Sequence, residues 1–289
     1  MDMRLGLANA DVPRNPADIT ADRLSRWVAR GVRGLVTHFT TSPDEILDAH
    51  APKLSRRLAD HDVAIFQYAG INANLVHPDR DLLGEVVPRI RAACAAGQSL
   101  GAEMLISGCG SYDERHFYGP HPGNHTEQAR LRLIESLRAV APIVADHGLV
   151  LAIECHALTT MDTPEHIREV LDQVDSPAVG ANFDPVNLLG SVAAVHDNAV
   201  EVRRIRGVIG DRCTASAHIK DVRITTDLVV HIVEAAPGHG CLDYPAYFEA
   251  VSTLPDGAPL IIEHLRVDQL DQALDFVRRT AKENGVMLR

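Results

Sequence analysis

The chain has 289 residues, of which 46% are hydrophobic and 23% charged, a composition typical of a globular protein with a sizeable core. Its formal net charge of −11, without a dense run of Lys or Arg, argues against a nucleic-acid partner. No apolar stretch approaches the roughly 20 residues of a membrane span, and the first segment lacks the apolar core of a signal peptide, so we expect a cytoplasmic protein with no membrane partner.

Short apolar runs alternate with helical patterns along the whole chain. Eight such runs begin at residues 3, 34, 63, 102, 149, 179, 216 and 259. Helical spacing of apolar residues covers 21–31, 85–101, 127–148 and 271–285, and several of these segments end on Gly. This alternation predicts parallel α/β architecture. A barrel takes about 250 residues, so we expect one (β/α)8 TIM-barrel domain over residues 1–289. An open doubly wound sheet is the alternative, but no G-x-G-x-x-G motif follows the first run.

Acidic or imidazole side chains stand at the C-terminal ends of the last four runs: Glu154, Asp184, His218 and Glu263. A carboxylate at the end of an apolar run costs free energy unless it is exposed or paired. In a barrel of parallel strands these ends converge on the active-site face. Oxygen and imidazole ligands without thiolate suit Mn²⁺, Mg²⁺, Co²⁺ or Zn²⁺. We therefore predict one divalent metal ion, with Mn²⁺ preferred, held by these four residues.

The sequence resembles the xylose-isomerase-like TIM barrels, which include sugar-phosphate isomerases, ketose 3-epimerases, hydroxypyruvate isomerases, inosose dehydratases and, more distantly, endonuclease IV. The similarity covers most of the chain and is strongest in residues 146–156, 182–190, 217–221, 238–244 and 260–264. In that family a single divalent metal is held by Glu, Asp, His and Glu on strands five to eight. These map in the same order onto Glu154, Asp184, His218 and Glu263.

The resemblance also implies a reaction. A small carbohydrate with adjacent hydroxyl and carbonyl oxygens would chelate the metal, which acts as a Lewis acid and stabilises an enediolate after proton loss. Glu154 and Glu263 would serve as metal ligands and also as catalytic base and acid. We therefore predict an isomerase or epimerase. A sugar-binding barrel or complex subunit without activity is a further alternative, and a homo-oligomer is compatible with barrels of this size.

Three residues near the expected metal ligands are candidate substrate-binding groups. His156 and Lys220 each lie two positions beyond a ligand, so in extended backbone they point to the same side as that ligand. Arg223 would bind a distal hydroxyl, carboxylate or phosphate, because guanidinium suits bidentate recognition of oxygens. The alternatives are an exposed loop histidine, an ion pair of Lys220 with Asp221 at the rim, and an arginine that only covers surface.

Asn187 marks a departure from the family pattern. Many family members carry Asp-x-x-His after the sixth strand, with the His touching substrate, whereas this chain has Asp184-Pro185-Val186-Asn187. Asn can donate and accept hydrogen bonds but carries no proton for transfer. We keep Asn187 as a substrate-binding candidate. The change makes a metal-dependent lyase, either a keto-inositol dehydratase or a 3-keto-glycoside eliminase, a competitor that begins with the same proton abstraction.

Other polar residues are expected near the same face. The segment 107–128 is rich in Gly, His and Tyr and predicts a loop that covers the substrate. Within it, we interpret His116, Tyr118, His121 and His125 as packing or hydrogen-bonding residues rather than ligands. His38 and Gln67 are candidate pocket groups. His264 should point away from Glu263, because adjacent strand residues alternate between faces.

Overall fold

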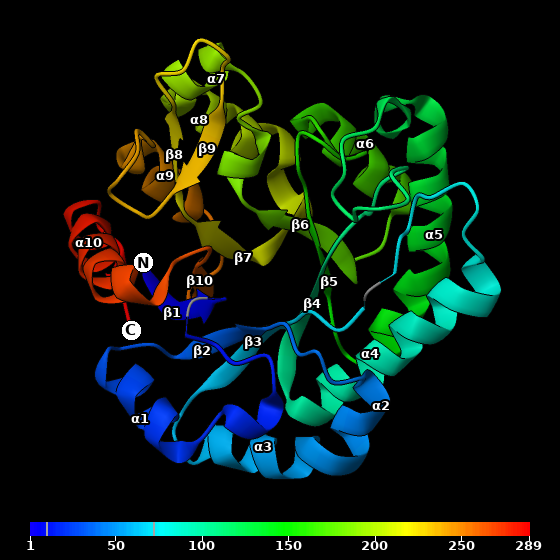
Figure 1. The fold of residues 1–289 in the computed structure, drawn as a ribbon, viewed down its shortest axis with the longest axis horizontal. Helices are drawn as coiled ribbons and strands as arrows, with labels where there is room; N and C mark the ends of the chain where they lie inside the picture. The colour runs from blue at the N-terminus through cyan, green and yellow to red at the C-terminus, as the bar shows by residue number, and fades with distance from the viewer. Residues whose placement is uncertain (10, 72) are drawn as a thin grey trace.

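The computed structural model describes residues 1–9, 11–71 and 73–289. In this part of the chain eight parallel strands close into a single barrel (Figure 1). All eight predicted apolar runs form its strands, which confirms the predicted fold. The barrel strands in chain order are β1 (Asp2–Ala8), β2 (Gly34–Thr37), β3 (Ala64–Tyr68), β4 (Ala102–Gly108), β5 (Leu151–Glu154), β6 (Val179–Phe183), β7 (Cys213–Ile219) and β10 (Ala258–Ile262).

Closure comes from the first and the last barrel strands. β1 pairs in parallel with β10, from Met3 opposite Ala258 to Leu7 opposite Ile262. A short strand, β11 (Met287–Leu288), adds to the outer end of β1. With β1 bonded to both β2 and β10, the ring of barrel strands leaves no open edge between them.

Helices surround the ring of strands (Figure 1). Their bounds are α1 (Ala21–Ala29), α2 (Pro43–Glu45), α3 (Ala51–Ala59), α4 (Val87–Leu100), α5 (Glu127–Asp146), α6 (Pro164–Val174), α7 (Val192–His196), α8 (Asn198–Ile209), α9 (Tyr244–Val251) and α10 (Leu270–Glu283). Several begin at a capping hydroxyl, as at Thr20, Thr126 and Thr163. None of the helices in the described ranges has the length and hydrophobicity that a membrane span requires.

The barrel interior is filled by a layer of apolar side chains around Phe66. Glycine on the neighbouring strands makes room for this ring: a Cβ added at Gly34 would lie 2.4 Å from it, and one added at Gly6 would lie 2.8 Å away. The rest of the layer comes from other strands: Ala8, Val36, Ile106, Ala152 and Ile261. The interior is therefore a packed core rather than a pore.

A polar layer also lies inside the barrel. The pairing of β2 with β3 skips Phe66, so β3 has an irregular register there. Such a bulge lets the consecutive residues Phe66 and Gln67 both point inward, against the normal alternation. The Gln67 amide nitrogen donates to Asn182 Oδ1 and Ser216 Oγ, each at 3.0 Å. The bulge thus brings a polar group to a place that strict alternation would give to the outer face.

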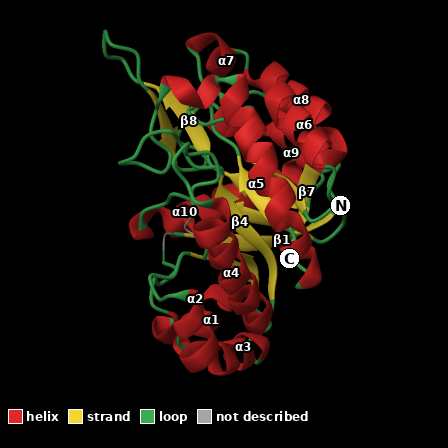
Figure 2. Ribbon diagram, turned by 90° about the vertical axis from the view of Figure 1, so that its right-hand side faces the viewer, coloured by secondary structure: helices red, strands yellow, loops and turns green. Residues whose placement is uncertain are grey.

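The C-terminal side of the barrel carries long loops and an extra hairpin, at the left of Figure 2. The hairpin is formed by β8 (Asp221–Ile224) and β9 (Ile232–Ala235). Asp221 at its base accepts backbone hydrogen bonds from Gly238, Gly240 and Leu242 at 2.9–3.1 Å. A Cβ at Gly240 would lie 2.3 Å from the Asp221 carboxylate, so this close approach requires glycine. Asp221 therefore anchors the turn after β9.

Candidate metal centre

Alternation along the strands aims the four predicted ligands into the barrel mouth. His218 lies two positions after the inward-facing Ser216 on β7, and Glu263 lies two positions after the inward-facing Ile261 on β10. Glu154 ends β5, and Asp184 follows β6 directly. A period of two residues therefore directs all four side chains to one point above the polar layer.

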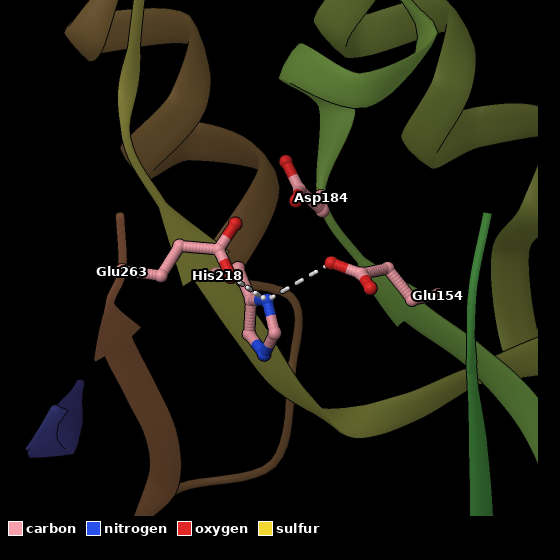
Figure 3. A group of neighbouring side chains, drawn as sticks. All are labelled: Glu154, Asp184, His218 and Glu263. Atoms are coloured by element: carbon pink, nitrogen blue, oxygen red, sulfur yellow. Dashed lines mark ion pairs between the residues drawn. The ribbon is translucent and has the colours of Figure 1, made fainter. Parts of the chain in front are cut away.

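The structure brings the four side chains together (Figure 3). Each offers one ligand atom, and these atoms all lie within 4.8 Å of one another. His218 Nδ1 is 2.9 Å from Glu263 Oε2 and 3.9 Å from Glu154 Oε1. Asp184, His218 and Glu263 are buried, and Glu154 is partly exposed. Three carboxylates this close together repel one another, and a cation between them and the imidazole would lower that free-energy cost.

Hydrogen bonding on the far side of His218 selects the nitrogen that faces the cluster. His218 Nε2 lies 2.8 Å from Gln67 Oε1. The Gln67 amide nitrogen already donates to Asn182 and Ser216, so its oxygen is the acceptor, and Nε2 must carry the proton. That tautomer leaves a lone pair on Nδ1, which points into the cluster.

Each carboxylate of the cluster has one oxygen engaged by a neighbouring donor. Asn187 and Lys220 approach Asp184 Oδ2 at 2.8 and 2.9 Å. Lys220 also contacts Glu263 Oε1 at 2.6 Å. The Tyr118 hydroxyl donates to Glu154 Oε2 at 2.7 Å. These contacts leave Asp184 Oδ1, Glu263 Oε2 and Glu154 Oε1 for the common centre.

One buried acceptor at the centre, Asp184 Oδ1, lacks a hydrogen bond among the described residues, and His218 Nδ1 faces Glu263 Oε2 at 2.9 Å. Unsatisfied buried acceptors are costly, and they need a partner that the protein itself does not supply. Three oxygens and one imidazole nitrogen form a donor set that suits a divalent cation. The residues therefore fit the predicted metal ion, and its identity stays open among the ions named above.

The protonation equilibria of the cluster follow from burial and from its charges. Burial opposes protonation of His218, but Glu263, Glu154 and Asp184 outweigh it and raise the His218 pKa. Burial acts to raise the pKa of Glu263, but Lys220 and His218 hold that pKa well below its usual range. Burial raises the pKa of Asp184, and Lys220 opposes this. His218 and Asp184 therefore bind a proton more readily than usual, whereas Glu263 stays ionised.

A cavity of about 760 Å³ opens beside the cluster. Of the predicted site residues, Glu154, His156, Asn187 and the pocket candidate His38 line it, whereas the other pocket candidate, Gln67, lies in the polar layer and does not. Lys220 lies outside its lining and is 1% exposed, paired with Asp184, Glu263 and Glu234 rather than with Asp221. Arg223 is exposed on β8 and does not line the cavity. Contacts of Lys220 and Arg223 with a substrate stay predictions.

Several cavity residues were not expected from the sequence. Tyr118 is a hydrogen-bonding loop residue, as expected, but its partner Glu154 was not predicted. His264 lines the cavity, against expectation, because β10 ends at Ile262 and His264 has a positive φ of 52°, so strand alternation no longer applies. Its Nδ1 lies 2.7 Å from Glu234 Oε2, a contact that raises the His264 pKa to about 9. The β8–β9 hairpin brings Glu234, which lies on β9, to this place, and local sequence does not reveal that approach.

Comparisons with known proteins agree with the geometry. The model of the family described as "Xylose isomerase-like TIM barrel" matches residues 27–280. No curated protein matches the chain. A D-psicose 3-epimerase structure is 12% identical with a TM-score of 0.73, over 98% of this chain and all of that one. A probable 3-DHS dehydratase from Bacillus anthracis is 14% identical with a TM-score of 0.69, over 95% and 98%. A fusion of a xylose isomerase-like TIM barrel with 4-hydroxyphenylpyruvate dioxygenase is 16% identical, with a TM-score of 0.67 over 98% of this chain. This chain spans only 43% of the length of that fusion protein.

Proposed function

Because this chain belongs to the xylose isomerase-like TIM barrel family, we propose that it is a divalent-metal-dependent isomerase or epimerase of a small sugar or a related hydroxy-carbonyl compound. The observation that supports this most is the cluster of Glu154, Asp184, His218 and Glu263, whose ligand atoms lie within 4.8 Å of one another beside a cavity. When bound, a divalent ion, with Mn²⁺ as our first choice, supplies a Lewis acid for the negative charge that develops on the carbonyl oxygen.

Glu154 is our candidate for the base that removes the proton next to the carbonyl group. Its side chain lines the cavity and is 18% exposed, so a substrate carbon has access to it. The Tyr118 hydroxyl fixes one of its oxygens and thereby the direction of the other. Burial and the Glu154 charge raise the pKa of Tyr118, so the phenol stays protonated and keeps donating. A base held in this way meets the geometric requirement for proton transfer.

Glu263 is our candidate for the acid that returns the proton. It enters the cluster from β10, while Glu154 enters from β5. Its side chain is only 3% exposed, and Lys220 holds one oxygen at 2.6 Å. A group so enclosed requires a substrate carbon that reaches deep into the barrel mouth. The proposed role of Glu263 therefore requires a more specific substrate position than the proposed role of Glu154.

His156 and Asn187 are our candidates for binding substrate hydroxyls. Both line the cavity next to Glu154. Burial lowers the pKa of His156, which keeps the imidazole neutral, and its Nδ1 accepts from the Leu158 backbone N–H at 3.1 Å, so Nε2 carries the proton and can donate to a substrate oxygen. The Asn187 amide nitrogen donates to Asp184 Oδ2 at 2.8 Å, which leaves its oxygen as the acceptor for a substrate hydroxyl.

A metal-dependent lyase is the second candidate, and the position of Asn187 favours it. Asn187 lines the cavity where relatives place a histidine, and its amide has no proton to transfer. Without that imidazole, the proton chemistry of an epimerase loses one participant. Elimination begins with the same proton abstraction by Glu154, and the leaving oxygen departs with a proton as water or an alcohol, so no proton has to be returned to carbon.

The first test is turnover by the metal-loaded protein in D₂O, followed by NMR. The panel contains ketoses, keto-inositols and 3-keto-glycosides. Deuterium in a recovered sugar or its epimer supports the isomerase, and release of water or an aglycone supports the lyase. If elemental analysis after loading finds no bound metal, the basis of both candidates is lost.

Replacement of each glutamate tests the two-base proposal. We expect Glu154→Gln and Glu263→Gln each to lower turnover by at least about 100-fold, since each removes a proton-transfer group. Metal content is measured on both variants, because either change also weakens the cluster. A metal-loaded Glu263→Gln variant with normal turnover would contradict the role of Glu263 as the acid and leave Glu154 as the sole proton-transfer group.

A further inference from the structure

The cavity beside the metal cluster has two unlike sides. One side carries the carboxylates Glu154 and Glu234 among its described lining residues. It is formed by the ends of β5 and β6, the β8–β9 hairpin and the segment after β10. Those that follow β1 and β2 include no carboxylate: Asn9, Arg14, His38, Phe39 and Thr40. The side that follows β1 and β2 therefore offers a cation and no carboxylate.

Arg14 is the only Arg or Lys among the described residues that line this cavity. The other cations near the site are neutralised, since Lys220 is surrounded by three carboxylates and His264 is paired with Glu234. The Arg14 side chain forms no ion pair with a carboxylate of the described residues. Arg14 and His38 line the same side of the cavity.

The segment that carries Arg14 is held in place. Pro13 precedes Arg14, and Pro16 begins a short 3-10 helix that Asn15 caps through a 2.9 Å hydrogen bond. The Thr40 backbone N–H donates to the Arg14 carbonyl at 2.9 Å. Proline at both sides and this anchor restrict the backbone, so little conformational entropy remains to be lost on binding. The guanidinium of Arg14 is therefore unpaired on a preorganised backbone segment, which lowers the entropy cost of binding a ligand.

We propose that Arg14 binds an anionic group, a carboxylate or a phosphate, at the end of the substrate remote from the metal cluster. Guanidinium recognises either group through two parallel hydrogen bonds. The Asn9 side chain lines the same side and has an amide that can donate, whereas the Thr40 hydroxyl donates to the Arg14 carbonyl at 3.4 Å. This inference rests on the proposed function for the other end of the substrate, and it narrows the substrate class to sugar acids, sugar phosphates or related acidic hydroxy-carbonyl compounds.

Three hexuloses that differ only at C6 test this proposal: D-fructose, D-fructuronate and D-fructose 6-phosphate. Binding and deuterium exchange are measured with the full chain loaded with Mg²⁺ at fixed ionic strength. Inorganic phosphate and acetate are titrated separately while the Arg14 side-chain N–H resonance is followed. We expect at least one anionic hexulose to bind about 10- to 100-fold more tightly than D-fructose. The preferred anion identifies carboxylate or phosphate as the natural group.

Variants of the exposed residues Arg14 and Arg56 test whether Arg14 causes the preference for the anionic hexulose. Arg14→Gln should remove the preference for the anionic hexulose and leave D-fructose binding unchanged, while Arg14→Lys should keep part of it because the charge remains. Arg56→Gln is the matched control, since Arg56 is exposed on α3, far from the lining residues, and has no ion pair with a described carboxylate. It should leave the preference intact.

The outcomes separate this inference from the proposed function. If D-fructose exchanges deuterium but the three hexuloses bind alike, or if Arg14→Gln keeps the preference, the anion site is wrong while the proposed function stands. If none of the hexuloses exchanges deuterium but phosphate or acetate shifts the Arg14 resonance, the anion site stands and the proposed function loses support. The absence of both signals contradicts both.

Discussion

The Tyr118 hydroxyl connects the loop after β4 to the Glu154 carboxylate. Its ring passes over Gly108, where an added Cβ would lie 2.5 Å from it, so glycine at that position lets the tyrosine reach the site. Groups that orient metal ligands from behind typically change metal affinity or activity by about 10–100-fold when removed. Tyr118 is therefore a positioning residue for Glu154 in the proposed mechanism.

We expect Tyr118→Phe to lower metal affinity or turnover by at least about 10-fold, because Glu154 loses the donor that fixes one oxygen. Metal titration and the deuterium exchange assay measure the two effects separately. Tyr112→Phe is the control from the same loop, since the Tyr112 hydroxyl is buried without a hydrogen-bond partner among the described residues. Equal behaviour of the two variants would contradict a positioning role for Tyr118.

Protonation of His218 should compete with metal binding. The negative charges of Glu263, Glu154 and Asp184 raise the pKa of His218, although burial opposes them. In the metal-free protein, the His218 imidazole therefore binds its second proton more tightly than an ordinary histidine does. A metal ion requires the unprotonated Nδ1. Metal affinity should therefore be high at alkaline pH and fall as the pH decreases, starting above the ordinary histidine pKa of about 6.5. Calorimetric metal titration from about pH 8.5 to about pH 5.5 measures this, and a flat affinity would contradict His218 as a ligand.

At the scale of elements, the contact between β2 and β3 shapes the interior of the barrel. Phe66 occupies the space that Gly34 and Gly6 leave free, and the bulge at Phe66 turns Gln67 toward His218. The same local irregularity thus fills the core and sets the tautomer of a predicted ligand. This coupling between packing and the site follows from two residues that are adjacent in the sequence.

We expect Gly34→Ala to lower the free energy of unfolding by about 1–3 kcal/mol, because the new methyl group overlaps the Phe66 ring. Gly207→Ala in α8 is the control, since nothing lies within 4 Å of the added Cβ. It should leave stability unchanged or raise it by about 0.5–1 kcal/mol, since alanine favours the helix. Denaturant unfolding of both variants measures the difference, and equal stability would show that the β2–β3 contact tolerates the methyl group.

For the molecule as a whole, metal binding should couple to stability. A ligand that binds only the folded chain stabilises it, by about 2.7 kcal/mol at a free concentration 100 times its Kd. We expect one divalent ion per chain, a higher midpoint of thermal unfolding when it is bound, and loss of that gain with a chelator. A single cooperative transition is expected as well, because we predict one domain over residues 1–289.

A second group of potential ligands provides the control for stoichiometry. His77, Asp79 and Glu114 also lie close together, but Asp79 and Glu114 are exposed and the three form no buried unsatisfied set. Asp79→Asn should leave the metal content and the stabilisation unchanged, whereas Asp184→Asn should remove both. Loss of the stabilisation in Asp79→Asn would move the metal site away from the barrel mouth.

Local sequence patterns were sufficient to predict the strands and the polar residues at the ends of the strands. Period-two alternation and helical spacing are local properties, so the eight strands, the main helices and the convergence of Glu154, Asp184, His218 and Glu263 were predictable. The tertiary structure decided which side chains meet across the barrel. The bulge before Gln67, the positive φ of His264, and the approach of Arg14, Tyr118 and Glu234 depend on loops whose paths are set by packing between distant segments. No local pattern encodes such contacts, because their free energy depends on residues that are far apart in the chain.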